Sequence, residues 1–332
     1  MLERGVGAGG GPRAPAVIAF VFPGQGAQYV GMGVDLADRY DVARRVFAEA
    51  SQAIGLDVLA LCRDGPPARL RETENTQPAI LTCCWAVASV LAEAGVRPDM
   101  AAGLSLGEYA ALVAAGALAF GDAVTVVRQR GRFMQEAAGD RQTAMAAVLG
   151  LEADRVIEVC EQTPGFVEAV NFNAPGQVVI AGDAGPVADA TARLKAAGAR
   201  RVIPLAVSAP FHTSLMRPAA DRLASVLAGT AVRPARLPVV ANVSGQPVEA
   251  PEAIRSSLIS QVAAPVRWEQ SVRTLRQLGA SVFVEAGPGT TLAGLIRKTV
   301  PDAEVISVEN QASLEAALAR LPKVSVSGGR PG

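Results

Sequence analysis

The sequence predicts an α/β fold in which helices flank a mostly parallel sheet and a second, smaller domain is inserted into the larger one. Two observations predict this arrangement. Strand-like apolar runs alternate with segments of helical periodicity along most of the chain. Between residues 141 and 207 the alternation changes to a denser pattern that is richer in strands. The 332 residues are enough for both domains.

The larger domain is assigned to residues 17–140 and 208–322. Its first strand is VIAFVF (17–22), a continuous apolar run that is typical of a buried strand. Helical periodicity predicts helices over 35–54, 78–94, 107–116 and 121–137. Further strands are predicted at DMAAGLS (99–105), LPVVANVSG (237–245), SVFVEAG (281–287) and AEVISVE (303–309).

The smaller domain, 141–207, contains six predicted elements. They are the strand 144–151, helix 154–162, strands 167–172 and 177–182, helix 185–199 and strand 201–207. The order βαββαβ is the ferredoxin-like pattern. The glycine-rich ends, 1–16 and 323–332, are predicted to be disordered because their composition is of low complexity. No strand leads into the first glycine run, so we do not expect it to form a phosphate loop.

Charge and cysteine usage exclude several classes of function. Lysine plus arginine and aspartate plus glutamate both number 31, which indicates neither a nucleic-acid partner nor a membrane surface. The four cysteines show no CxxC spacing, so we expect no metal site and a reducing, cytoplasmic setting. The N-terminus lacks a signal-peptide pattern, and no apolar run is long enough to cross a membrane.

The stretch GLSLGEY (103–109) predicts a nucleophile elbow around Ser105. Gly103 and Gly107 would let a strand and a helix approach closely on either side of an exposed serine hydroxyl. The N–H of Leu106, at the start of the following helix, is the natural donor to an oxyanion. The pattern alone is only moderately specific in a chain so rich in glycine and alanine.

His212 is the only histidine in the chain and therefore the only imidazole that could activate Ser105. It lies in VSAPFHTSLM, where the chain returns from the smaller domain to the larger one, and a cleft between domains is a common place for a site. A lone histidine is more often structural, but the elbow favours the catalytic interpretation.

Two further features point to the same region. FPGQGAQ (22–28) is a glycine-rich turn at the exit of the first strand, where ligands bind in open α/β sheets. The stretch VRQRGRFMQEA offers a guanidinium for a carboxylate, but the residues alone do not choose between Arg128, Arg130 and Arg132.

These stretches belong to a series of blocks that covers about residues 17–320. The blocks are FVFPGQGAQYVGMG, NTQPAI, GLSLGEYAAL, RGRFMQEA, NFNAPGQVVIAG, VSAPFHTSLM, PVVANVSG, PVRWEQSV and VEAGPGTTLAGLIRK. In this order they resemble the malonyl-CoA:acyl carrier protein transacylase family, which includes acyltransferases of fatty-acid and polyketide synthesis. One departure is Leu104, where the family usually has histidine. The GLSLGE variant resembles discrete acyltransferases that serve polyketide synthases in trans.

The resemblance implies an α/β-hydrolase-like large domain with the ferredoxin-like insertion, and it assigns roles to residues. Ser105 is the nucleophile and His212 the base, and the backbone carbonyl of Gln261 orients the imidazole. The backbone N–H groups of Gln25 and Leu106 form the oxyanion hole. Arg130 pairs with the free carboxylate of malonyl, and Asn173 is a polar residue near the site.

The implied reaction is ping-pong transfer of malonyl from CoA to the phosphopantetheine thiol of an acyl carrier protein, with no bound cofactor or metal. Phe211, beside the base, is expected to disfavour an α-branched acyl group. Arg297 and Lys298 are candidates for docking an acidic carrier protein, although cations there also suit a helix C-terminus. A monomer is expected. An acyl hydrolase acting on carrier proteins, transfer of an unusual acyl group between carrier proteins and a non-catalytic scaffold remain as alternatives.

Overall fold

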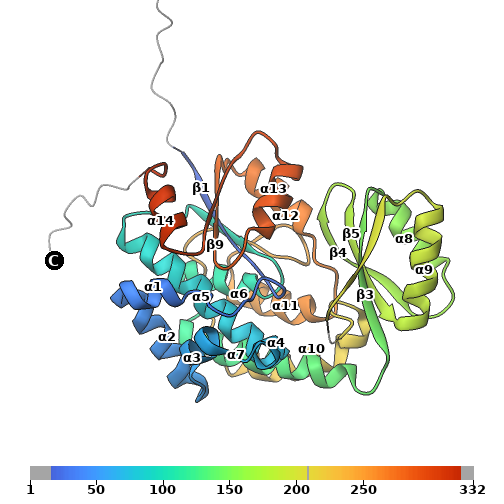
Figure 1. The fold of residues 1–332 in the computed structure, drawn as a ribbon, viewed down its shortest axis with the longest axis horizontal. Coiled ribbons are helices and arrows are strands. Elements are labelled where there is room, and N and C mark those ends of the chain that lie inside the picture. Colours follow the sequence, from blue (N-terminus) through green and yellow to red (C-terminus); the bar gives the residue numbers. More distant parts are fainter. Residues whose placement is uncertain (1–15, 208, 323–332) are drawn as a thin grey trace, which may run out of the picture.

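The computed structural model describes residues 16–207 and 209–322, so residues 1–15 and the tail 323–332 that the sequence predicts to be disordered lie outside it. Two sheets organise the chain, and Figure 1 shows them side by side along the long axis. A six-stranded sheet with most of the helices forms the larger body. A four-stranded sheet with two helices forms the smaller one.

The larger sheet has the mostly parallel character that the sequence predicts. Its strands are β1 (Ile18–Phe22), β2 (Met100–Gly103), β7 (Val239–Val240), β8 (Pro247–Val248), β9 (Val282–Ala286) and β10 (Glu304–Val308). Their order is β10-β9-β1-β2-β7-β8, and every pair except β7–β8 is parallel. The central strands β1 and β9 are buried along their whole length, as their apolar sequences require.

Helices cover both faces of this sheet. They are α1 (Val34–Arg39), α2 (Asp41–Ile54), α3 (Val58–Asp64), α4 (Pro67–Arg71), α5 (Thr73–Glu93), α6 (Gly107–Ala114), α7 (Phe120–Ala138), α10 (Arg217–Ala228), α11 (Pro251–Val262), α12 (Trp268–Gln277), α13 (Thr291–Thr299) and α14 (Gln311–Leu318). One apolar core unites β1 and β9 with α5, α6 and α7, and a second lies under α12 and α13. No helix in the described part of the chain has the length and apolar character needed to span a membrane.

The structure of the larger body differs from the sequence predictions in three places. The single helix predicted over 35–54 is two helices, because Tyr40 adopts an extended conformation between them. The short helices α3 and α4 were not predicted. The strand predicted over 237–245 ends at Val240, since the chain then turns back with the N–H of Gly245 donating to the carbonyl of Ala241 at 2.8 Å.

The smaller sheet consists of β3 (Thr143–Leu149), β4 (Val167–Ala174), β5 (Gln177–Asp183) and β6 (Arg201–Leu205), with α8 (Ala153–Glu161) and α9 (Ala184–Ala196) between them. Its strands are antiparallel in the order β4-β5-β3-β6, the arrangement of a ferredoxin-like unit. Alternate side chains separate its two faces. Val148 and Ile180 pack against the helices, whereas Met145 and Val179 face the larger body.

Candidate active site

Ser105 lies in a strained turn between β2 and α6. Its φ of 51° is in the left-handed region, where a residue other than glycine costs about 1–3 kcal/mol. A Cβ on Gly103 would lie 1.9 Å from the carbonyl carbon of Gly107, and a Cβ on Gly107 would lie 2.0 Å from the carbonyl oxygen of Phe22. Both glycines are therefore needed for the strand, the turn and the helix to pack this closely.

His212 meets Ser105 from the segment that returns from the smaller sheet. Its Nε2 lies 2.7 Å from the Ser105 Oγ, and its Nδ1 lies 2.8 Å from the backbone carbonyl oxygen of Gln261. Because a carbonyl only accepts hydrogen bonds, Nδ1 carries the proton and Nε2 is free to accept one from the serine. His212 also has a positive φ, 64°.

The surroundings of His212 keep the imidazole neutral. Burial and then the charge of Arg130 lower the pKa of His212 to about 4, although the carbonyl of Gln261 acts in the opposite direction. At neutral pH the ring is therefore neutral with Nε2 unprotonated, the state that a general base requires.

Arg130 is the arginine of its helix that reaches the site. It is buried on α7 and donates hydrogen bonds to the Ser105 Oγ (3.1 Å), Gln77 Oε1 (2.9 Å) and Gln261 Oε1 (2.9 Å). Arg132 instead pairs with Glu136 in solvent. Arg128 donates to the backbone carbonyl of Ile54 at the end of α2, so Arg130 is the one of the three arginines that contacts Ser105.

Two backbone N–H groups remain available beside Ser105. In residues 16–207 and 209–322, the N–H groups of Gln25 and Leu106 donate to no protein acceptor. The turn that carries Gln25 packs tightly on the elbow, since a Cβ on Gly24 would lie 2.4 Å from the carbonyl oxygen of Leu104. The two donors thus belong to adjoining loops at the carboxyl ends of β1 and β2, where a bound oxyanion would need them.

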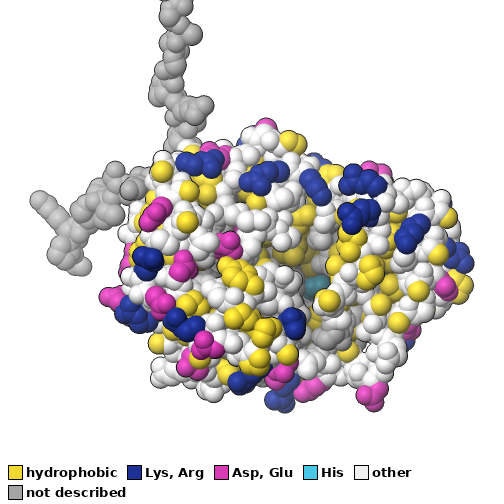
Figure 2. Space-filling view, in the orientation of Figure 1, with side chains coloured by type: hydrophobic (Ala, Val, Ile, Leu, Met, Phe, Trp, Pro, Cys, Tyr) yellow, Lys and Arg dark blue, Asp and Glu magenta, His cyan; other side chains and the backbone are white. Residues whose placement is uncertain are grey.

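Ser105, His212, Arg130, Gln25 and Leu106 all line a pocket of about 260 Å³ between the two sheets. Figure 2 shows the single histidine at the bottom of a hollow in this face, with lysine and arginine side chains along the upper edge of the same face. Phe211 and Met134 give the pocket apolar walls, and Asn173 lines it with a side-chain oxygen that has no partner among the described residues. Leu104 is half-buried and packs against the apolar core under α12 and α13 while lining the pocket.

The two cations proposed for docking point in different directions. Lys298 reaches from α13 to the smaller sheet, where its Nζ donates to Gln177 Oε1 at 2.9 Å, and Gln177 lines the pocket. Arg297 donates to the backbone carbonyl of Val305 on β10 at 3.2 Å. Of the two cations, Lys298 is therefore the one that contacts a residue lining the pocket.

The structure also brings together three residues for which the sequence alone predicts no role. Gln77 contacts Arg130, whereas Glu108 and Asn242 lie beneath Ser105 and hydrogen-bond to each other. All three are buried polar residues. Each stood within a quoted family block, NTQPAI, GLSLGEYAAL or PVVANVSG, but nothing in the spacing of these blocks shows that they meet.

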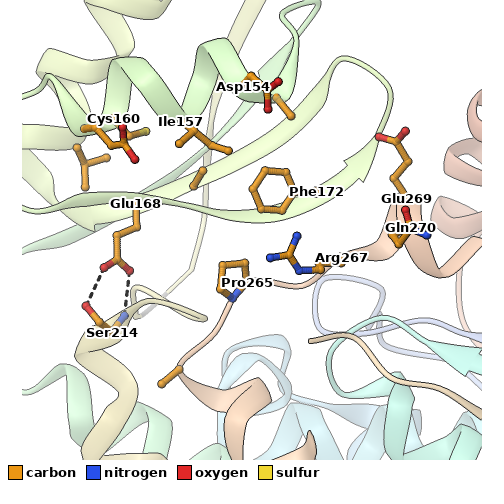
Figure 3. A pocket seen from close by; sticks show the side chains of 15 residues that line it. Asp154, Ile157, Cys160, Glu168, Phe172, Ser214, Pro265, Arg267, Glu269 and Gln270 are labelled. Carbon is orange, nitrogen blue, oxygen red and sulfur yellow. Dashed lines mark hydrogen bonds between the residues drawn. The ribbon is translucent and has the colours of Figure 1, made fainter. Parts of the chain in front are cut away.

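A larger cavity of about 610 Å³ lies elsewhere, between α8, β4 and the segment that follows α11. Figure 3 shows Glu168 pointing from β4 to Ser214, whose N–H and hydroxyl both donate to its carboxylate. Neither Ser105 nor His212 lines this cavity, so its size does not make it the reaction site. Across the described ranges, no group of three or more histidine, cysteine or acidic residues could hold a metal ion.

Comparison with known proteins agrees with this geometry. The acyl transferase domain model matches residues 19–320. The malonyl CoA-acyl carrier protein transacylase of Bacillus subtilis is 43% identical over 307 residues, which is 92% of this chain and 97% of that protein.

Solved structures give the same result. The malonyl CoA-acyl carrier protein transacylase of Coxiella burnetii superimposes with a TM-score of 0.90 at 39% identity and covers 92% of this chain and 98% of that one. A malonyl-transacylase in complex with a type II polyketide synthase acyl-carrier protein has a TM-score of 0.89 at 43% identity, covering 92% and 99%. The chain therefore belongs to the acyl transferase domain family.

Proposed function

We propose that this enzyme transfers a malonyl group from CoA to the phosphopantetheine thiol of an acyl carrier protein, for fatty-acid or polyketide synthesis. The observation that carries the proposal is the contact of Ser105 with His212 beside the buried guanidinium of Arg130. The relatives named as malonyl transacylases, and the complex of one of them with a polyketide carrier protein, support the same donor and acceptor.

In the first half-reaction His212 removes the hydroxyl proton as the Ser105 Oγ attacks the thioester carbonyl. The N–H groups of Gln25 and Leu106 donate to the resulting oxyanion, and loss of one such donor typically costs on the order of 100–1,000-fold in rate. The protonated imidazole then donates its proton to the leaving CoA thiol. The Gln261 carbonyl holds the ring through both transfers.

In the second half-reaction the phosphopantetheine thiol of the carrier protein attacks the malonyl-serine ester. His212 accepts the thiol proton and returns it to the Ser105 Oγ when the tetrahedral intermediate collapses. The malonyl group leaves on the carrier thiol, and the enzyme returns to its starting state. CoA and the carrier thus use the same site in turn, which gives ping-pong kinetics.

Arg130 would bind the free carboxylate of malonyl. An uncharged acyl group such as acetyl would leave this buried guanidinium without a charged partner, which is costly. Phe211 and Met134 both line the pocket, and we expect their bulk to disfavour an α-methyl group, so that malonyl is preferred over methylmalonyl as the donor. Asn173 would donate to or accept from the polar arm of the thiol substrate.

The four described cysteines are free and buried, which supports a reducing compartment, and we propose a cytoplasmic monomer. Sedimentation at working concentrations tests the monomer.

Intact-mass measurement after exposure to malonyl-, methylmalonyl- and acetyl-CoA tests the function. Wild-type protein should gain the mass of one malonyl group, and Ser105→Ala should gain none. Release of the acyl group to water rather than to a carrier thiol would instead identify an acyl hydrolase.

A further inference from the structure

A cluster of buried polar side chains lies beneath the reacting groups. The proposed mechanism uses none of these side chains and only the backbone carbonyl of one of the residues, Gln261. The cluster consists of the side chains of Glu108, Asn242 and Gln261, which are 1%, 0% and 0% exposed. They come from three separate segments: the first turn of α6, the turn after β7 and the last turn of α11. Buried polar groups are costly unless they are hydrogen-bonded, so their bonds indicate what the cluster does.

Glu108 joins the other two segments at a single carboxylate oxygen. Its Oε2 accepts from the backbone N–H of Asn242 at 2.9 Å and from Gln261 Nε2 at 2.8 Å. The carboxylate sits in the first turn of α6, where the helix dipole favours negative charge.

The two partners of Glu108 hold the backbone of the nucleophile on both sides. Asn242 Oδ1 accepts from the N–H of Ser105 at 2.6 Å, and Asn242 Nδ2 donates to the carbonyl of Gly103 at 2.7 Å. Gln261 Nε2 donates to the carbonyl of Ser105 at 2.9 Å. The strained conformation at Ser105 is thereby fixed by hydrogen bonds from outside the elbow.

Gln261 extends the same connections to the base and to the arginine. Its backbone carbonyl accepts from His212 Nδ1, and its side-chain Oε1 accepts from Arg130. A displacement of Gln261 would therefore move the imidazole, the guanidinium and the serine backbone relative to one another.

We propose that Glu108 is a positioning residue for acyl transfer. It holds Ser105 and His212 in their positions relative to each other through Asn242 and Gln261. This inference rests on the proposed roles of Ser105 and His212. Glu108 touches neither the substrate nor the reacting atoms. Because misplacement of reacting groups by about 1 Å can cost on the order of 100-fold in rate, the expected effect is on the chemical step rather than on substrate affinity.

Two substitutions of Glu108 separate geometry from charge. Glu108→Gln keeps an oxygen that accepts from both donors, so its single-turnover rate of acylation by malonyl-CoA should stay within about fivefold of wild type. Glu108→Ala removes the acceptor, and its rate should fall by about 100-fold with little change in KM. Glu49→Ala, on the exposed side of α2, is the matched control.

The single histidine supplies a second readout. The Nδ1 proton of His212 bonded to a carbonyl should give one assignable downfield resonance in the proton NMR spectrum, because no other imidazole is present. The resonance should persist in Glu108→Gln and shift or broaden in Glu108→Ala. A folded Glu108→Ala variant that keeps the wild-type acylation rate and this resonance overturns the inference.

Asn242→Ala keeps the inference falsifiable if Glu108→Ala does not fold. It should lower the acylation rate to a similar degree, since both residues act through one cluster. A wild-type rate in Asn242→Ala refutes the positioning role. If wild-type enzyme forms no malonyl-Ser105 at all, the proposed function fails, and the NMR comparison still decides whether Glu108 positions His212.

Discussion

Two buried groups, His212 and Glu108, should contribute to the pH dependence of folding stability with opposite signs. Burial and Arg130 lower the pKa of His212 from 6.5 to about 4, and burial raises the pKa of Glu108 from 4.5 to about 7. Between pH 4.5 and 6.5 the unfolded chain therefore binds a proton at His212 that the folded protein does not, which makes stability rise with pH. Glu108 is protonated only in the folded protein over the same range, which makes stability fall with pH.

The two effects have similar size. Each group changes the unfolding free energy by about 1 kcal/mol per pH unit between pH 5 and 6.5, because on average about three quarters of a proton differs between the two states. In the wild-type protein they oppose each other and largely cancel. Removing either group reveals the other.

Glu108→Gln should therefore gain stability relative to wild type as pH rises from 5 to 6.5, by about 1 kcal/mol per pH unit. His212→Gln should lose stability relative to wild type over the same range, with similar magnitude. Denaturant unfolding followed by the fluorescence of the two tryptophans, at half-unit pH steps, measures both differences.

The comparison with wild type removes the contributions of the other titrating groups. Glu49→Gln makes the same chemical change at an exposed position and serves as the control for replacing a carboxyl by an amide. A Glu108→Gln difference that does not vary with pH would show that the carboxyl is not held protonated by burial, and the reasoning would fail.

Three further changes have defined outcomes. Arg130→Ala should lower kcat/KM for malonyl-CoA by about 100-fold or more but change that for acetyl-CoA far less, as steady-state comparison of the two donors would reveal. Gly107→Ala should prevent the elbow from packing, since its Cβ would meet the Phe22 carbonyl at 2.0 Å, and a cooperative thermal transition near that of wild type would contradict this. Lys298→Glu should raise the apparent KM for the carrier protein and leave that for malonyl-CoA unchanged, whereas Arg297→Glu, at a side chain that faces β10, should change neither KM.

The sequence predicted the architecture well where periodicity is strong. The buried run VIAFVF became β1, and the apolar stretch from residue 78 became most of α5. It failed where tertiary contacts override local preference. No glycine or proline marks the break at Tyr40, and the β-rich stretch PVVANV leaves the sheet after Val240. The turn after Val240 places Asn242 under the elbow. The predicted strand is therefore too long at the point where the chain turns to contribute to the site.

The predicted site shows a similar division. Ser105 and His212 could be found because one lies in a recognisable turn and the other is the only imidazole, but the choice of Arg130 required the family resemblance. Glu108 and Asn242 could not be found, because a glutamate in a first helical turn and an asparagine after a strand are ordinary at those positions. Their importance depends on a contact across 134 residues of sequence, which no local pattern contains.

The backbone strain at the site explains why such distant contacts are needed. Ser105 and His212 are the only residues other than glycine with positive φ in residues 16–207 and 209–322. Each conformation costs about 1–3 kcal/mol, and a typical hydrogen bond returns about 1 kcal/mol. Ser105 is held by bonds from Asn242 and Gln261, and the turn at His212 by Thr213, whose hydroxyl donates to Pro210 at 2.7 Å. The strained conformation of Ser105 thus depends on fixed partners in other segments, which gives the buried cluster under the elbow a role in positioning the nucleophile as well as in the core.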